Sequence, residues 1–168
     1  MADAAARTAL VVTASDGANA GVREDTSGAQ VAARLEGLGF TVARRLLPDE
    51  QWEIEEALIA GASAHALIVT TGGTGLTPRD VTPQATRAVV DYEVPGLAEA
   101  MRAVGRAATP LADLSRAIVG VRGRCLIANL PGSPKGALES LEALVPVLDH
   151  ALETLAGPFD HDPERRQG

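Results

Sequence analysis

The 168-residue chain is poor in aromatic residues and in positive charge, and both shortages bear on its partners. Aromatic residues make up 2%, too few for the stacking platform that binds single-stranded nucleic acid. Lysine and arginine together number 15 against 22 aspartates and glutamates, a net charge of −7. A surface that binds the phosphate backbone of DNA or RNA needs clustered cations. We therefore expect no nucleic-acid partner.

The chain also has little cysteine and histidine, which argues against a zinc site and against disulfides. The single cysteine, Cys125, excludes an intramolecular disulfide and a cysteine-based zinc site, and its apolar neighbours favour a small buried side chain. The histidines at 65, 150 and 161 lack the spacing of a zinc hydrolase. The sequence holds no 18-residue apolar run and no secretory signal among its first dozen residues, so we expect a cytoplasmic protein without a membrane partner.

Length and composition suit a single globular domain over residues 1–168. A chain of this size buries about 70% of its unfolded surface around one core. Its 46% of apolar and 22% of charged residues are close to globular averages. We expect the two ends, residues 1–7 and 158–168, to be flexible.

Three continuous apolar runs predict strands buried on both faces of a parallel sheet. They are 9–12, 66–69 and 125–128, and further strands are expected at 41–47 and 118–121. Each of the three runs leads into small, polar or glycine-rich residues. In open α/β sheets, ligands bind outside the carboxyl ends of the strands, so these three loops are expected to share one pocket.

Apolar residues at helical spacing predict five helices between and after these strands. Ser27, Asp49 and Thr82 are the expected N-caps of the first three, and Pro83 suits the first turn of the third. Pro146 is expected to kink the last helix, because the apolar stripe continues in phase beyond it. The expected spans are 27–39, 49–61, 82–90, 97–107 and 137–155.

The segment Thr70–Pro83, TTGGTGLTPRDVTP, carries the densest chemical signal. Its glycines let the backbone approach a ligand, and a run of N–H groups and threonine hydroxyls suits phosphate. It is not a Walker A loop, because no Gly-Lys-Ser/Thr follows the glycines. It is not the dinucleotide fingerprint G-x-G-x-x-G either, because Pro78 stands where that motif has its last glycine. A simple turn would not need the adjacent Arg79 and Asp80, which favours a binding loop.

Two further features extend this interpretation. The segment Asn129–Gly136 is stiffened by two prolines and contains Lys135, the only lysine of the chain. This lysine could contact a phosphate, or its place here could be due to chance. Asp16, Asp49 and Asp80 lie at the ends of predicted elements, where carboxylates hold Mg²⁺ if substrate phosphates complete the shell. Asp49 also suits a helix cap and Asp16 a turn, so from the residues alone only Asp80 points to function.

The stretch Thr70–Thr86, TTGGTGLTPRDVTPQAT, resembles the signature of the MogA/MoaB family of molybdopterin adenylyltransferases, which includes the G domains of gephyrin-like proteins. The likeness covers the chain from about residue 8 to 155. Its other parts are VTASD at 12–16 with residues 23–28, LPDE at 47–50, LSRA at 114–117 and LPGSPK at 130–135.

The resemblance implies a three-layer α/β/α domain with a mostly parallel sheet, usually assembled as a homotrimer. It implies transfer of AMP from MgATP to the phosphate of molybdopterin, with release of pyrophosphate. Asp49 and Asp80 would be the catalytic residues and would meet Mg²⁺, with Asp16 as a further candidate ligand. The residues implied to bind substrate or phosphate are Thr71, Gly72, Gly73, Thr74, Gly75, Arg79, Ser115, Arg116, Asn129, Pro131, Gly132, Ser133 and Lys135.

Two alternatives stay open at this point. The chain could be a non-catalytic module that binds or carries the pterin cofactor, or a MoaB-type paralogue. Asp49 and Asp80 together favour the enzyme, because binding alone would tolerate the loss of metal ligands. The resemblance further implies that the product passes to a separate MoeA-like molybdate insertase.

Overall fold

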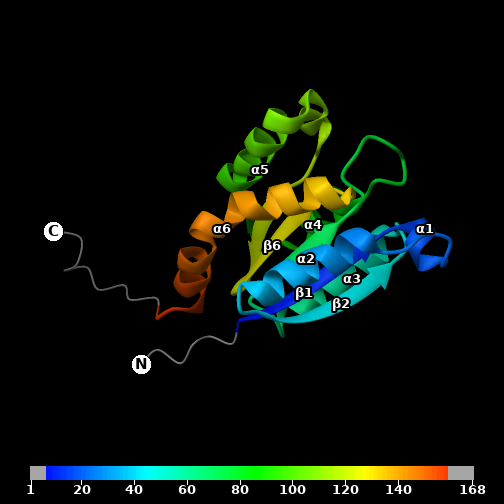
Figure 1. The fold of residues 1–168 in the computed structure, drawn as a ribbon. Helices are drawn as coiled ribbons and strands as arrows, with labels where there is room; N and C mark the ends of the chain where they lie inside the picture. Colours follow the sequence, from blue (N-terminus) through cyan, green and yellow to red (C-terminus); the bar gives the residue numbers. More distant parts are fainter. Residues whose placement is uncertain (1–6, 159–168) are drawn as a thin grey trace.

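The computed structural model describes residues 7–158, which form one six-stranded sheet with helices on both faces (Figure 1). The predicted flexible ends lie outside the described residues except for Arg7 and Pro158. The strands are β1 (Thr8–Ala14), β2 (Thr41–Leu47), β3 (Leu67–Thr71), β4 (Tyr92–Glu93), β5 (Val119–Arg122) and β6 (Cys125–Leu130).

The sheet has the order β2-β1-β3-β6-β5-β4. The first four strands of this order are parallel, whereas β5 and β4 are antiparallel to their neighbours. The carboxyl ends of β2, β1, β3 and β6 therefore lie at one edge. The predicted α/β class with a mostly parallel sheet is confirmed.

The helices cover the sheet from both sides and complete three layers (Figure 1). One core cluster joins the sheet to α2, α5 and α6, and a second joins it to α3 and α4. The helices are α1 (Asp16–Asn19), α2 (Thr26–Gly37), α3 (Gln51–Ala62), α4 (Thr82–Val89), α5 (Pro95–Ala108), the 3-10 helix η1 (Pro110–Leu114) and α6 (Pro134–Ala156).

The central strands are apolar throughout because they are covered on both faces. In β1, Ala9 and Val11 belong to the first core cluster, whereas Leu10 and Val12 belong to the second. Cys125 lies in the second cluster with no exposed surface, and burial raises the pKa of its thiol to about 12. The cysteine is therefore an inert core residue, as its apolar surroundings predicted.

The helix spans are close to those predicted, but the expected N-cap of α2 is wrong. Asp25 caps this helix and accepts the backbone N–H of Gly28 at 2.9 Å. Ser27 lies inside the first turn and is buried, and its hydroxyl donates to Thr71 Oγ1 at 3.3 Å. Ser27 thus binds the end of β3 from the first turn of α2, and the cap is formed by the carboxylate of Asp25.

The expected caps of α3 and α4 are also wrong. The N-cap positions are Glu50 and Val81, and neither forms a side-chain capping bond. Asp49 instead accepts the backbone N–H of Asp16 at 3.0 Å, and Thr82 Oγ1 donates to the carbonyl of Gly72 at 3.0 Å. Both polar side chains bind neighbouring loops, which the spacing of one helix could not reveal.

Proline and short elements account for the remaining differences. Helix α5 begins at Pro95 and α6 at Pro134, each earlier than predicted, because proline fits a first helical turn. Pro146 lies within an uninterrupted α6, which changes direction towards its carboxyl end in Figure 1, as the predicted kink requires. Strand β4 has two residues, α1 four and η1 five. These elements are too short for a periodic signal in the sequence and were not predicted.

Candidate functional site

A polar cavity of about 510 Å³, the first cavity, opens where the carboxyl ends of β1, β3 and β6 meet the start of α2. It brings Asp49 and Asp80 together with several predicted phosphate-binding residues. Its lining residues are Thr13, Ala14, Ser15, Ala18, Arg23, Glu24, Asp25, Thr26, Ser27, Asp49, Thr71, Gly72, Gly73, Asp80, Gly132, Ser133 and Pro134.

The floor of the first cavity is backbone that only glycine can form. Gly72 and Gly73 have φ values of 88° and 69°, in the left-handed region. A Cβ atom on Gly72 would lie 2.3 Å from the carbonyl oxygen of Ala14, and one on Gly73 would lie 2.3 Å from Thr82 Oγ1. The glycine pair thus lets β3 turn sharply against β1 and α4, which leaves room for a ligand above it.

Asp80 follows this floor in the loop 74–80. The backbone N–H and the hydroxyl of Thr77 both donate to Asp80 Oδ2, at 2.9 and 2.8 Å. Within residues 7–158 its other oxygen, Oδ1, accepts no hydrogen bond. The loop therefore holds the carboxylate by one oxygen beside the cavity and leaves the second able to meet a cation or a ligand.

Asp49 reaches the same cavity from the end of β2 and is tied to the end of β1. Its Oδ2 accepts the backbone N–H of Asp16 at 3.0 Å, and its own N–H donates to Asp16 Oδ1 at 2.9 Å. Burial raises the pKa of Asp49, and the negative charges of Asp16 and Asp80 add to the rise. A cation bound near Asp49 and Asp80 would relieve this repulsion.

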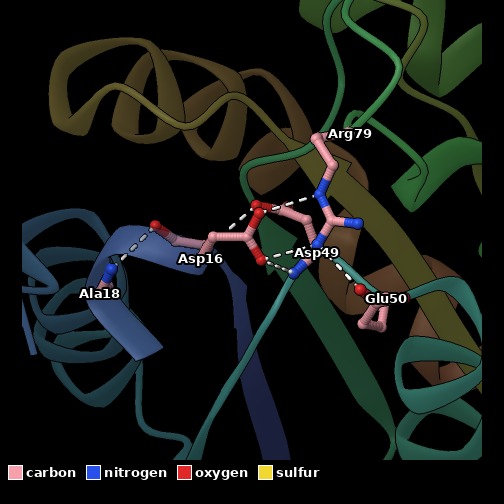
Figure 2. Close-up of polar contacts among 6 residues, drawn as sticks. Asp16, Ala18, Asp49, Glu50 and Arg79 are labelled. Carbon is pink, nitrogen blue, oxygen red and sulfur yellow. Dashed lines mark hydrogen bonds and ion pairs between the residues drawn. The ribbon is translucent and has the colours of Figure 1, made fainter. Parts of the chain in front are cut away.

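Arg79 lies between Asp16 and Glu50, as Figure 2 shows. Its Nε and Nη2 donate to the two carboxylate oxygens of Asp16 at 3.0 and 2.9 Å, and Nη2 also donates to Glu50 at 2.9 Å. These bonds lower the pKa of Asp16 and raise the pKa of Arg79. Arg79 thus joins the Asp80 loop to the ends of β1 and β2.

The carboxylates fit a metal ion that arrives with a phosphate ligand. Among residues 7–158, no group of three or more His, Cys, Asp or Glu side chains is arranged to hold a metal. Mg²⁺ is commonly held by one or two carboxylates while phosphates and water complete its octahedron. Asp49 and Asp80 meet that requirement, whereas both oxygens of Asp16 are bound to Arg79.

A second cavity, of about 470 Å³, adjoins the first and shares Ser133 with it. It lies between the glycine loop, α5, η1 and α6, and more of its lining is apolar. The predicted site residues Thr74, Gly75, Ser115 and Pro131 line it. Its other lining residues are Leu76, Ala98, Met101, Arg102, Gly105, Thr109, Leu111, Ala112, Leu114, Ala117, Gly136, Glu139 and Ser140.

Four predicted ligand contacts, Arg79, Arg116, Asn129 and Lys135, line neither cavity. Asn129 has no exposed surface, and its Nδ2 donates to Thr70 Oγ1 at 3.2 Å and Thr86 Oγ1 at 2.8 Å. Its Oδ1 accepts the backbone N–H of Ile118, so Asn129 ties β6 to its surroundings. The side chain of Lys135 is 81% exposed, with Nζ 3.8 Å from Glu139.

The structure also brings to the first cavity the hydroxyls of Thr13 and Ser27, which the sequence did not single out as site residues, beside the predicted Thr71. Ser27 donates to Thr71 Oγ1, Thr71 to Thr13 Oγ1 at 3.2 Å, and Thr13 to Asp25 Oδ2 at 2.9 Å. Arg44 holds the same Asp25 oxygen at 2.8 Å. The segments 12–16 and 23–28 already carried part of the family resemblance, and this likeness was the available signal.

Comparison with known proteins finds relatives among molybdenum cofactor proteins. Residues 10–150 match the family described as the probable molybdopterin binding domain. The molybdopterin adenylyltransferase of Haemophilus influenzae is 45% identical over 139 residues, 80% of this chain and 71% of that protein. The enzyme of the same name from Helicobacter pylori strain J99 is 38% identical over 154 residues, 89% of this chain and 88% of that protein.

The fold is equally similar to solved structures. The molybdopterin biosynthesis enzyme MoaB from Thermus thermophilus superposes with a TM-score of 0.82 and 52% identity. This match covers 91% of the present chain and 99% of the MoaB chain. The three-layer architecture is therefore common to the two proteins.

Proposed function

The chain belongs to the molybdopterin binding domain family, and on that premise we propose that it is a molybdopterin adenylyltransferase. The observation that carries the proposal is the pair of carboxylates, Asp49 and Asp80, that line one polar cavity beside the glycine loop. A carrier would need the cavity but not two carboxylates that repel each other. Their arrangement favours chemistry on a metal-bound phosphate.

The reaction needs positioning more than it needs a strong base. A phosphate oxygen of molybdopterin attacks the α-phosphorus of MgATP, and a new P–O bond forms as the bond to the β-phosphate breaks. AMP is thereby joined to molybdopterin and pyrophosphate leaves. Asp49 and Asp80 would hold the Mg²⁺ of the nucleotide, which offsets the charge on the phosphates. The N–H groups of the glycine loop at Gly72 and Gly73 would bind phosphate oxygens.

The two cavities differ in a way that supports separate roles. The first is polar and holds both carboxylates, which suits the nucleotide with its phosphates. The second has a more apolar lining with a few polar groups such as Ser115, which suits a flat pterin ring. Ser133 lines both, so the phosphate of molybdopterin would meet ATP beside it.

The proposal also covers the oligomeric state of the protein, its location in the cell and the fate of its product. We expect one domain that forms a homotrimer, and the exposed apolar side chains of Leu76, Leu111 and Leu114 around the second cavity support association. Light scattering on the purified protein measures this state. We expect a cytoplasmic location, where ATP is available, and hand-over of the product to a separate MoeA-like insertase. No helix within residues 7–158 is long and apolar enough to cross a membrane.

A direct assay tests the enzyme against the non-catalytic carrier. Purified protein is incubated with molybdopterin, ATP and Mg²⁺, and adenylylated molybdopterin and pyrophosphate are measured. We expect both products from the parent protein and neither above background from Asp80→Asn. Molybdopterin binding without product, in the parent as in the variant, would overturn the enzyme and favour the carrier.

A further inference from the structure

Arg116 holds the loop that carries Asp80 from its outer side. This residue lies between η1 and β5, and its backbone N–H donates to the carbonyl of Thr74 at 3.0 Å. Its Nε donates to the carbonyl of Gly75 at 2.8 Å, and its Nη2 donates to the carbonyl of Asp80 at 2.6 Å. One guanidinium thus binds the first and the last parts of the loop.

The resemblance implied Arg116 as a substrate contact, but its guanidinium is engaged by contacts within the protein. It lines neither the first nor the second cavity, although Ser115 beside it lines the second. Its remaining terminal nitrogen, Nη1, donates to Gln84 Oε1 on α4 at 3.2 Å. All three guanidinium nitrogens therefore donate to protein oxygens.

The loop is fixed from its other side by Arg79, the residue before Asp80. Arg79 binds Asp16 and Glu50, and Asp16 in turn exchanges bonds with Asp49. Asp80 is therefore held between two arginines that bind different parts of the fold. Because Gly75 has no side chain, Asp80 Oδ2 can lie 2.9 Å from where a Cβ would be, so the carboxylate packs closely against the backbone that Arg116 binds.

We propose that Arg116 is a positioning residue of the adenylyl transfer, which sets the place of the Asp80 carboxylate by binding the carbonyls of Gly75 and Asp80. The inference rests on the proposed function for its effect on catalysis. A planar guanidinium with diverging donors spans two carbonyls, whereas the single ammonium of lysine does not reproduce that geometry. Loss of Arg116 therefore misplaces Asp80 without removing a ligand contact.

The test compares Arg116→Ala and Arg116→Lys with Arg122→Ala. Arg122 is a matched control, because its Nη1 donates to the carbonyl of Val89 at 2.7 Å near the amino end of β6, at the opposite edge of the sheet. We expect kcat of Arg116→Ala to fall about 100-fold, as misplacement of a catalytic group causes, while KM for ATP and molybdopterin is unchanged. Added guanidinium ion should restore part of kcat in Arg116→Ala, and methylammonium should not.

A second measurement needs no activity. Amide hydrogen exchange at Thr77 and Asp80 should become faster in Arg116→Ala and stay at the parent rate in Arg122→Ala. A rise in KM with kcat unchanged, or unchanged exchange at Thr77 and Asp80, would overturn the inference. If the parent protein forms no product, the proposed function fails, but the exchange rates still decide whether Arg116 holds the loop.

Discussion

Asp16 and Asp49 each accept the backbone N–H of the other, at 2.9 and 3.0 Å. This exchange closes a ring between the ends of β1 and β2, and it places two carboxylates side by side. Arg79 neutralises Asp16, whereas Asp49 is left half-buried towards the first cavity. The two carboxylates therefore have different roles. Asp16 holds the ends of β1 and β2 together with Arg79, and Asp49 is available to a ligand.

The raised pKa of Asp49 makes a prediction for stability. Burial and nearby negative charge raise it above its ordinary value of 3.8, so ionisation of Asp49 opposes folding. The loss of folding free energy caused by this ionisation is absent below pH 3.8, because the carboxyl is then protonated in both states. It grows as the pH rises towards the raised pKa of the folded state and is complete above that pKa. Asp49→Asn keeps an oxygen for the N–H of Asp16 and should raise Tm at about pH 7. Thermal unfolding from about pH 3 to 8 measures the difference, and an equal Tm at every pH would refute the account.

Asp80→Asn should remove activity and leave molybdopterin binding intact. An amide keeps an acceptor for Thr77 but loses the charge that holds a metal-bound phosphate, so we expect kcat to fall by about 100- to 1,000-fold. Equilibrium binding of molybdopterin and steady-state kinetics separate the two effects. Asp149→Asn on α6, which removes an exposed charge paired with Arg7, is the control and should keep full activity. Parallel loss of binding and activity would show that Asp80 only builds the pocket.

Arg79→Lys should lower activity more than it lowers stability. The ion pairs of Arg79 with Asp16 and Glu50 are exposed, and such pairs contribute about 0.2–1 kcal/mol to folding. Lysine cannot bind both oxygens of Asp16, so the loop before Asp80 loses its alignment. We expect Tm within a few degrees of the parent and a clear fall in kcat. The control is Arg87→Lys, because Arg87 forms an exposed ion pair with Glu93. If Arg79→Lys and Arg87→Lys lowered kcat equally, Arg79 would have no special role in aligning the loop.

Asn129→Leu should destabilise the fold. The substitution leaves the hydroxyls of Thr70 and Thr86 and the N–H of Ile118 without their partner in the interior, at a cost of about 2–4 kcal/mol. Urea unfolding measures this loss. The exposed Lys135→Ala should change the free energy of unfolding by less than about 0.5 kcal/mol. Full stability of Asn129→Leu together with weaker ligand binding would instead make Asn129 a substrate contact.

The strands could be predicted because their signal is local. Continuous apolar runs such as 66–69 occur where both faces of a strand are covered. Such a run can be recognised in the sequence without knowledge of the fold. The convergence of three loops followed from the parallel arrangement, because carboxyl ends of parallel strands share an edge. The glycine loop and Asp80 were found in the same way, as residues that follow a strand, whereas the role of Asp49 was implied by the family resemblance.

The partners of individual polar side chains could not be predicted. Asp49 and Thr82 were expected to cap helices, but both bind a loop that is distant in the sequence. Asn129 follows an apolar run and so was expected in a loop, yet β6 continues to Leu130 and buries it. A polar residue near an element end can bind locally or across the fold, and only the three-dimensional arrangement decides between them.

If this protein transfers an adenylyl group, the fate of the α-phosphorus of ATP shows it most directly. Purified protein is incubated with molybdopterin, Mg²⁺ and ATP labelled either at the α- or at the γ-phosphate, in parallel reactions. We expect the α-label in the pterin product and the γ-label in pyrophosphate, in equal amounts, and neither product without molybdopterin. A γ-label in the pterin product, or release of AMP and pyrophosphate regardless of molybdopterin, would contradict the proposed transfer.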